Sequence, residues 1–362
     1  MRKGLVVGNF DETIVKWLLD PFHFYKRKIN SQLKLKLVYE QVLTLDEIDA
    51  ALIKHQPAIL FFTIDWTVPV IEVVSYLKKL HEQPGRPRIV YLDHYCLSST
   101  PFFEVMPYVD VYVRKQLLTP VSDYNDKDFR GGNIVADFIS RHYNIQLNDF
   151  EFGSQIPEGC EDKLIPGWNL GTADTLSRLA RYPLLRKFSR SVEKTLDLTC
   201  RLTVREHDDT DPNSIYFIHR SKCLEAVMAL EGKFNIAHNA NGEQISYRTF
   251  QRELRESRMA LSPFGWGEIT DRDFRIINAR TLLLKPDMSH LETYPDVFRA
   301  GETYAPVKWD FSDLEEVCEY YLSHPAETRE ITENAINVYD EYFRQAKFID
   351  KIEEILQRLD DI

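Results

Sequence analysis

The 362-residue sequence lacks the features of disulfide-bonded, repetitive and membrane-spanning proteins. Its five cysteines are an odd number, lie far apart and form no C-x-x-C pair, so neither a disulfide framework nor a zinc cluster is indicated. No apolar run reaches the roughly 18 residues that a membrane span requires. There is no internal repeat of roughly 20 to 50 residues and no low-complexity tract, which argues against solenoids and repeat arrays.

The sequence is also short of basic residues, with 45 Lys and Arg against 56 Asp and Glu and a formal net charge of −11. Nucleic-acid binding usually needs a basic surface that displaces counterions from phosphates, so we expect no nucleic-acid partner. This excess of acidic over basic residues still allows a local basic pocket that binds a small diphosphate. The chain starts Met1-Arg2-Lys3 and continues into a short apolar strand, without the longer apolar core of a signal peptide, so we expect a cytoplasmic protein.

The first part of the sequence alternates short apolar segments with amphipathic segments of helical length. Strands alternating with helices predict a parallel sheet, because parallel strands need crossover connections. The predicted strands are 5–8, 35–39, 58–64, 88–93 and 109–113, and the predicted helices are 11–26, 45–55, 68–81, 102–107 and 132–143.

The same alternation resumes after a connection at 144–191 that is interrupted by proline and glycine. The length suits two α/β domains, and charged helical segments follow from residue 310. We therefore predict an α/β protein of two Rossmann-like domains facing across a cleft, with C-terminal helices. The predicted strands here are 215–218, 234–238, 258–262 and 281–285, and the predicted helices are 222–230, 247–256 and 272–279.

A glycine-bearing segment follows the predicted strand 258–262, where ligands of open α/β sheets bind. Gly265 and Gly267 allow a tight turn and close backbone approach, and the next helix presents a partly positive N-terminus. Arg272 can form charge-assisted bonds to phosphate. The segment thus predicts a diphosphate site; the alternative is that the glycines only shape the turn while nearby acidic residues complement the helix dipole.

Two other predicted strand ends carry side chains suited to such a ligand. Lys285 is placed to balance a phosphate, and His290 and Thr293 follow it with hydrogen-bonding groups for sugar or nucleoside hydroxyls. Arg220 follows the predicted strand 215–218 and can also meet an anion, and Arg201 is a weaker candidate. The alternatives are a solvated Lys285 at a capped turn and a purely surface role for Arg220.

Asp93 and His94 end a predicted strand in the first half of the chain. A carboxylate or imidazole there can act as a general base that deprotonates a hydroxyl group. The alternative is that Asp93 caps a turn and His94 packs. The segment Asp208-Asp209-Thr210-Asp211 looks like a pair of metal-holding aspartates, but its polar surroundings favour a solvated loop, so we predict no metal.

Three segments, 262–268 (SPFGWGE), 272–274 and 285–288, resemble the donor domain of bacterial GT-B glycosyltransferases, in particular the exostosin-like and group-1-like branch. In that branch a Gly-rich turn leads into an R-x-x-E helix. The N-terminal half resembles the family only in its alternation of predicted strands and helices. This chain departs from the motif by placing Arg275 where the glutamate belongs, which suggests a donor with an extra carboxylate or phosphate, or lost activity.

The resemblance implies an acceptor domain at 1–170, a nucleotide-sugar donor domain at 171–325, and helices at 326–362 that cross back to the first domain. It implies a metal-independent enzyme without a cofactor that moves sugar from a nucleotide-sugar donor to a hydroxyl of a carbohydrate or glycolipid acceptor, in surface polysaccharide or glycolipid synthesis. The alternatives are an inactive nucleotide-sugar-binding protein and a sugar-nucleotide epimerase of similar architecture. The predicted site comprises catalytic Asp93 and His94 and donor-binding Arg220, Gly265, Trp266, Gly267, Glu268, Arg272, Arg275, Lys285, His290 and Thr293.

Overall fold

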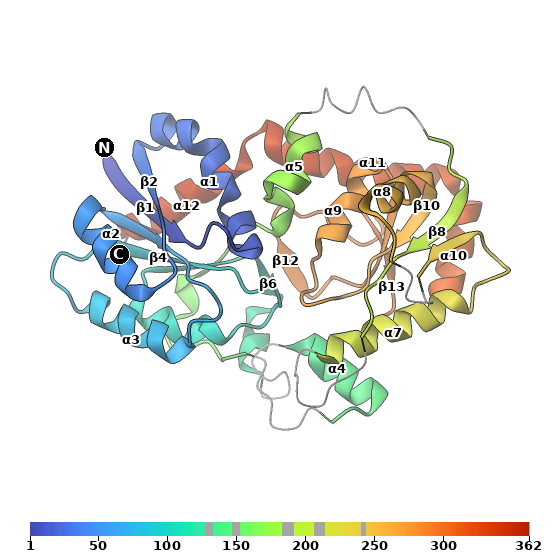
Figure 1. Ribbon diagram of the computed structural model, residues 1–362, viewed down its shortest axis with the longest axis horizontal. Helices are drawn as coiled ribbons and strands as arrows, with labels where there is room; N and C mark the ends of the chain where they lie inside the picture. The colour runs from blue at the N-terminus through green and yellow to red at the C-terminus, as the bar shows by residue number, and fades with distance from the viewer. Residues whose placement is uncertain (127–132, 147–152, 183–191, 206–213, 240–243, 362) are drawn as a thin grey trace. The chain divides into compact units, whose positions relative to one another are not determined.

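The computed structural model describes residues 1–126, 133–146, 153–182, 192–205, 214–239 and 244–361. The chain divides into two compact units. Their elements can be followed in Figure 1 by colour, from blue at the N-terminus to red at the C-terminus. Unit 1 comprises Met1–Asn133, Glu151–Thr175 and Tyr342–Ile362, and unit 2 comprises Ile134–Phe150 and Leu176–Glu341.

Unit 1 contains a six-stranded, all-parallel sheet with the strand order β2-β1-β3-β4-β5-β7. Its central strands are continuous buried apolar runs, as expected for a parallel sheet that is covered on both faces. The strands are β1 (Arg2–Gly8), β2 (Leu35–Gln41), β3 (Ile59–Phe62), β4 (Arg88–Asp93), β5 (Val111–Arg114) and β7 (Leu164–Pro166); the helices are α1 (Thr13–Gln32), α2 (Leu45–His55), α3 (Val70–His81) and α12 (Lys347–Asp361).

Unit 2 contains a five-stranded, all-parallel sheet with the strand order β13-β11-β10-β8-β9. Its core joins these strands to α7 and α10. The strands are β8 (Leu196–Cys200), β9 (Ile236–His238), β10 (Ser257–Leu261), β11 (Leu282–Pro286) and β13 (Ala305–Val307); the helices include α4 (Ile134–Tyr143), α7 (Ile215–Met228), α8 (Tyr247–Glu256), α9 (Asp271–Asn278) and α10 (Leu314–Ser323).

Further elements complete the described chain. They are η1 (Pro101–Tyr108), β6 (Gln116–Leu118), α5 (Asp174–Arg181), β12 (Leu291–Thr293) and α11 (Pro325–Arg344). None of the helices in the described part of the chain is both long and apolar enough to cross a lipid bilayer.

The structure confirms the predicted α/β class with two Rossmann-like parallel sheets, but it corrects one strand. Residues 215–218 form the first turn of α7, and the strand β8 lies earlier, at Leu196–Cys200. A run of four apolar residues does not distinguish a strand from a buried helical turn. The first three residues of α7 are all buried, which explains the misleading run. β8 carries its apolar residues at every second position, and this signal was missed.

Both units are discontinuous in sequence. Residues 134–150 belong to unit 2, and Tyr342–Ile362 belongs to unit 1. In unit 1 the apolar stripe of α12 packs on α1, with the Phe348 ring 5.2 Å from that of Phe22. In unit 2 Phe138 of α4 packs edge-on against Trp309, with ring centroids 5.2 Å apart. Packing of these helices, rather than chain order, decides their unit.

Candidate functional site

The strand order of unit 2 reverses between β8 and β10. The chain runs from β8 to the edge strand β9 and then returns to β10 on the other side of β8. Ligands of open α/β sheets bind outside the carboxyl ends of the strands at such a reversal, where the two following loops diverge. In this unit the loops are 201–204 after β8 and 262–270 after β10, so the candidate site is built from them.

Arg220 of α7 joins these two loops. Its guanidinium donates to the carbonyl oxygen of Thr203, at 3.2 Å, and makes a long contact to that of Phe264, at 3.5 Å. A Cβ atom at Gly265 would lie 3.3 Å from Cζ of Arg220 and would overlap Nη2. A side chain at position 265 would therefore require the guanidinium of Arg220 to move. The sequence analysis expected close approach of a ligand at this glycine, whereas the structure places the Arg220 side chain there.

Arg220 and Arg272 form a pair of positive charges. Burial, and secondly the charge of Arg272, lower the pKa of Arg220 to about 10. Neither guanidinium forms an ion pair with a carboxylate among the residues that the structure describes. Arg272 stands in the first turn of α9, whose N-terminus is closed by a capping box of Thr270 and Asp273. Two neighbouring cations at a helix N-terminus favour the binding of an anion with two or more charges.

A pocket of about 620 Å³ opens beside these residues. Its volume lies within the usual range of small-molecule sites. Arg220 is not part of the lining, but Thr203, which accepts its hydrogen bond, is. The lining includes Arg201, Thr203, Asn239, Tyr247, Arg272 and Arg275.

The other two arginines of the pocket are already compensated. Arg201 forms two hydrogen bonds to Glu253, at 2.8 and 2.7 Å. Arg275 donates to Asp271 at 2.8 Å and to the hydroxyl of Tyr247 at 2.5 Å. Arg275 thus adds no net charge, and its presence does not by itself require a donor with an extra carboxylate or phosphate. The uncompensated charge of the site comes from Arg220 and Arg272.

The structure corrects the expected role of Lys285. Its side chain is fully buried and forms an ion pair with Asp273 at 3.1 Å. Burial lowers the pKa of Lys285, and the charge of Asp273 counteracts this. Asp273 also accepts from the backbone N–H of Thr270 at 2.8 Å. Lys285 therefore ties β11 to the start of α9 and is not available to a phosphate.

The remaining predicted donor residues lie around the loop but do not line the pocket. Glu268 and Thr293 are buried, at 1% and 5% exposure, whereas Trp266 is 55% exposed. Burial lowers the pKa of His290 to about 4, so its imidazole is neutral at pH 7. The sequence analysis missed Asn239 and Tyr247, although the strand-end rule already pointed to the residue after the strand 234–238.

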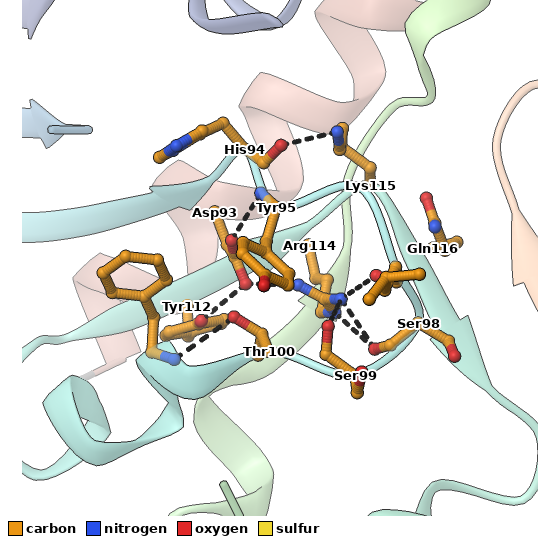
Figure 2. Close-up of polar contacts among 12 residues, drawn as sticks. Asp93, His94, Tyr95, Ser98, Ser99, Thr100, Tyr112, Arg114, Lys115 and Gln116 are labelled. Carbon is orange, nitrogen blue, oxygen red and sulfur yellow. Dashed lines mark hydrogen bonds and ion pairs between the residues drawn. The ribbon is translucent and has the colours of Figure 1, made fainter. Parts of the chain in front are cut away.

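Figure 2 shows Asp93 at the end of β4 with its polar partners. The carboxylate is fully buried, is ion-paired with Arg114, and accepts from the Tyr112 hydroxyl at 2.7 Å and the Tyr95 N–H at 2.8 Å. Burial raises the pKa of Asp93, but the Arg114 charge and these hydrogen bonds outweigh it and hold the pKa below its usual value. A carboxylate so enclosed cannot reach an acceptor hydroxyl. We therefore revise its expected role from general base to structural anchor.

The same ion pair organises the loop that follows β4 (Figure 2). Arg114 donates to the carbonyl oxygens of residues 97, 98 and 99. Lys115 donates to the His94 carbonyl at 2.6 Å. Gln116 donates to the carbonyl of Cys96 at 2.8 Å. Three consecutive side chains, from the last residue of β5 to the first residue of β6, thus hold the loop through its backbone.

His94 is buried in this loop at 2% exposure. Its Nδ1 lies 3.2 Å from the Thr63 hydroxyl, while Nε2 is buried and has no hydrogen-bond partner among the residues that the structure describes. Burial lowers its pKa to about 4, so the ring is neutral at pH 7. A neutral imidazole has one unprotonated ring nitrogen, and a general base needs such a nitrogen to accept a proton. The role of His94 stays a prediction.

The aspartates at 208–211 lie outside the described residues. Within the described ranges, no group of three or more His, Cys, Asp and Glu side chains is arranged to hold a metal ion. Independence from metals and cofactors stays a prediction.

No family model and no curated protein sequence matches the chain. Among solved structures, it is similar to S. aureus MnaA in a UDP co-structure, with 11% identity and a TM-score of 0.47 over 99% of this chain and 98% of that one. It is similar to a glycosyltransferase from Rickettsia africae ESF-5, with 12% identity and a TM-score of 0.47 over 98% and 97%. It is also similar to an α,α-trehalose-phosphate synthase (UDP-forming) from Burkholderia vietnamiensis, with 11% identity and a TM-score of 0.43 over 98% and 100%. Sequence identities of 11–12% do not show that two proteins share a function.

Proposed function

We propose that this protein is a glycosyltransferase that binds a nucleotide-sugar donor in unit 2 and transfers the sugar to a hydroxyl of a carbohydrate or glycolipid acceptor. The observation that carries the proposal is the pair of guanidiniums of Arg220 and Arg272, which have no carboxylate partner among the described residues. They lie at the strand-order reversal beside a pocket of about 620 Å³.

The charge of the pair suits a diphosphate. Guanidiniums bind phosphate oxygens through paired N–H bonds, and the N-terminus of α9 adds backbone donors. In glycosyl transfer the diphosphate is the leaving group, and its charge grows as the glycosidic bond breaks. Cations already held in place stabilise that charge without rearranging. The exposed ring of Tyr247 lines the same pocket and is available to the rest of the donor, whereas the amide of Asn239 is held by two hydrogen bonds to the backbone of Leu202.

Binding of nucleoside diphosphates tests the donor site directly. Calorimetric titration with UDP, GDP and ADP should find binding by at least one of them. Arg272→Ala and Arg220→Ala should each weaken it roughly ten- to hundredfold, because a hydrogen bond to a charged group is worth about 1.5–3 kcal/mol. The matched control is Arg299→Ala, which removes an exposed arginine paired with Glu302 elsewhere in unit 2 and should leave binding unchanged.

Analysis of the reaction products distinguishes the proposed transfer reaction from the alternative functions. Transfer releases free nucleoside diphosphate and forms a new glycoside with an added acceptor. An epimerase would change the configuration of the sugar without any acceptor. Tight binding without product would indicate an inactive binding protein. Failure of every nucleotide and nucleotide sugar to bind would refute the assignment of the site.

A further inference from the structure

A second cavity, of about 450 Å³, lies along the open edge of the sheet in unit 1. β2 is the edge strand, and among the described residues it pairs with β1 alone. Four consecutive residues of β2, Lys36–Tyr39, line the cavity. Lys26 and Asn30 of α1 and His55 at the end of α2 complete it. We refer to this cavity as the edge groove.

The backbone of β2 offers hydrogen bonds to the edge groove. The Val42 N–H, directly after β2, donates to the Gly8 carbonyl of β1 at 3.1 Å. Backbone groups alternate in direction along a strand, so positions 40, 38 and 36 also face β1. The N–H and C=O groups of Leu37 and Tyr39 then face the groove. An exposed edge of this kind is a template for a further strand.

The edge groove also carries uncompensated positive charge. The segment 26–36 contains five exposed cations and no acidic residue, in a chain whose net charge is −11. The ammonium of Lys26 lies 4.7 Å from the centre of the Tyr39 ring. The nearest carboxylate on β2, Glu40, is already engaged by Lys54 and His55, each at 2.5 Å. The five cations are Lys26, Arg27, Lys28, Lys34 and Lys36, and none has an ion-pair partner in the described part of the chain.

We propose that the edge groove binds an acidic peptide segment, which adds to the sheet as an extended strand beside β2. Main-chain hydrogen bonds to Leu37 and Tyr39 would fix its direction. Successive side chains of a strand point to opposite faces of the sheet, so neighbouring carboxylates would meet Lys26 on the face of Tyr39 and Lys36 on the face of Glu40. The lining residues of β2 span about 13 Å, enough for four or five residues of the added strand. The same lysines would repel the β2 edge of a second copy, because like charges facing each other destabilise strand pairing.

Fluorescence anisotropy with a labelled eight-residue peptide that alternates pairs of glutamates with pairs of valines, and so carries carboxylates on both faces, tests this proposal on the full chain. We expect saturable binding that falls roughly tenfold or more in the Lys26→Glu/Lys36→Glu variant, because charge reversal repels the peptide. The control variant Lys78→Glu/Lys79→Glu reverses two exposed lysines on α3 and should bind as the unaltered protein does. The milder Lys26→Gln/Lys36→Gln variant should weaken binding less than charge reversal does.

Binding measurements with two modified peptides and with lipid vesicles distinguish strand addition from a purely electrostatic attraction. The peptide with glutamine in place of glutamate should not bind, because it lacks the carboxylates. The peptide whose alternate backbone amides are N-methylated should not bind either, because it cannot donate backbone hydrogen bonds to β2. Equal binding of the N-methylated peptide would overturn the proposal. It would also be overturned if the charge-reversed variant bound normally, or if the protein bound phosphatidylserine vesicles through these lysines but not the peptide.

Discussion

Gly265→Ala tests whether the candidate site depends on the contact between Arg220 and the turn after β10. The backbone of Gly265 is not in the left-handed region, so alanine fits without strain. Its Cβ would overlap Nη2 of Arg220 and lie 3.3 Å from Cζ. The guanidinium must therefore move away and release the carbonyl oxygens of Thr203 and Phe264. Since a hydrogen bond to a charged group is worth about 1.5–3 kcal/mol, nucleotide affinity should fall roughly ten- to hundredfold.

The assay is calorimetric titration of the best nucleoside diphosphate, combined with thermal unfolding. The melting temperature should change little, because Gly→Ala at a compatible position also lowers the entropy of the unfolded chain. A double-mutant cycle gives the decisive comparison: in an Arg220→Ala background, Gly265→Ala should have almost no further effect on affinity. An equal loss of affinity in both backgrounds would refute the argument, because the methyl group would then act without Arg220.

Three further predictions concern stability and reactivity. Arg114→Met should lower the free energy of unfolding in denaturant titrations by about 3–5 kcal/mol, because it leaves a buried carboxylate without its cation. One thiol per native chain, Cys96, should react quickly with a disulfide reagent, because the other four cysteines are buried. Stability should fall as the pH is lowered from 7 to 5, because His94, His219 and His290 have pKa values of about 4 when folded and about 6.5 when unfolded.

Each of these predictions has a result that would contradict it. Unchanged stability of Arg114→Met would mean that the ion pair in Figure 2 does not anchor the loop after β4. Fast reaction of several thiols would contradict the burial of Cys160, Cys200, Cys223 and Cys318. The sign of the pH effect follows from proton binding: the unfolded imidazoles bind protons below about pH 6.5, and the folded ones do so only near pH 4. Stability that is constant from pH 7 to pH 5 would show that these rings are not buried.

The α/β class and the position of the candidate loop after β10 could be predicted from local patterns. Alternating strands and helices require crossover connections, so the parallel sheets followed from periodicity. The carboxyl ends of strands are where ligands bind, and this rule led to Gly265 and Arg272 before any contact was known. The strand prediction failed at residues 215–218, where one buried turn of α7 has the same composition as a strand.

Contacts between distant residues decided the roles of the charged side chains. Asp93 and Arg114 are register partners on the neighbouring strands β4 and β5. Lys285 meets Asp273 only because β11 lies beside the start of α9. Arg220 reaches Gly265 across 45 positions of sequence (265 − 220) through the packing of α7 on the sheet. Local sequence shows which residues carry charge, but strand order and helix packing determine which charges neutralise one another and which remain for a ligand.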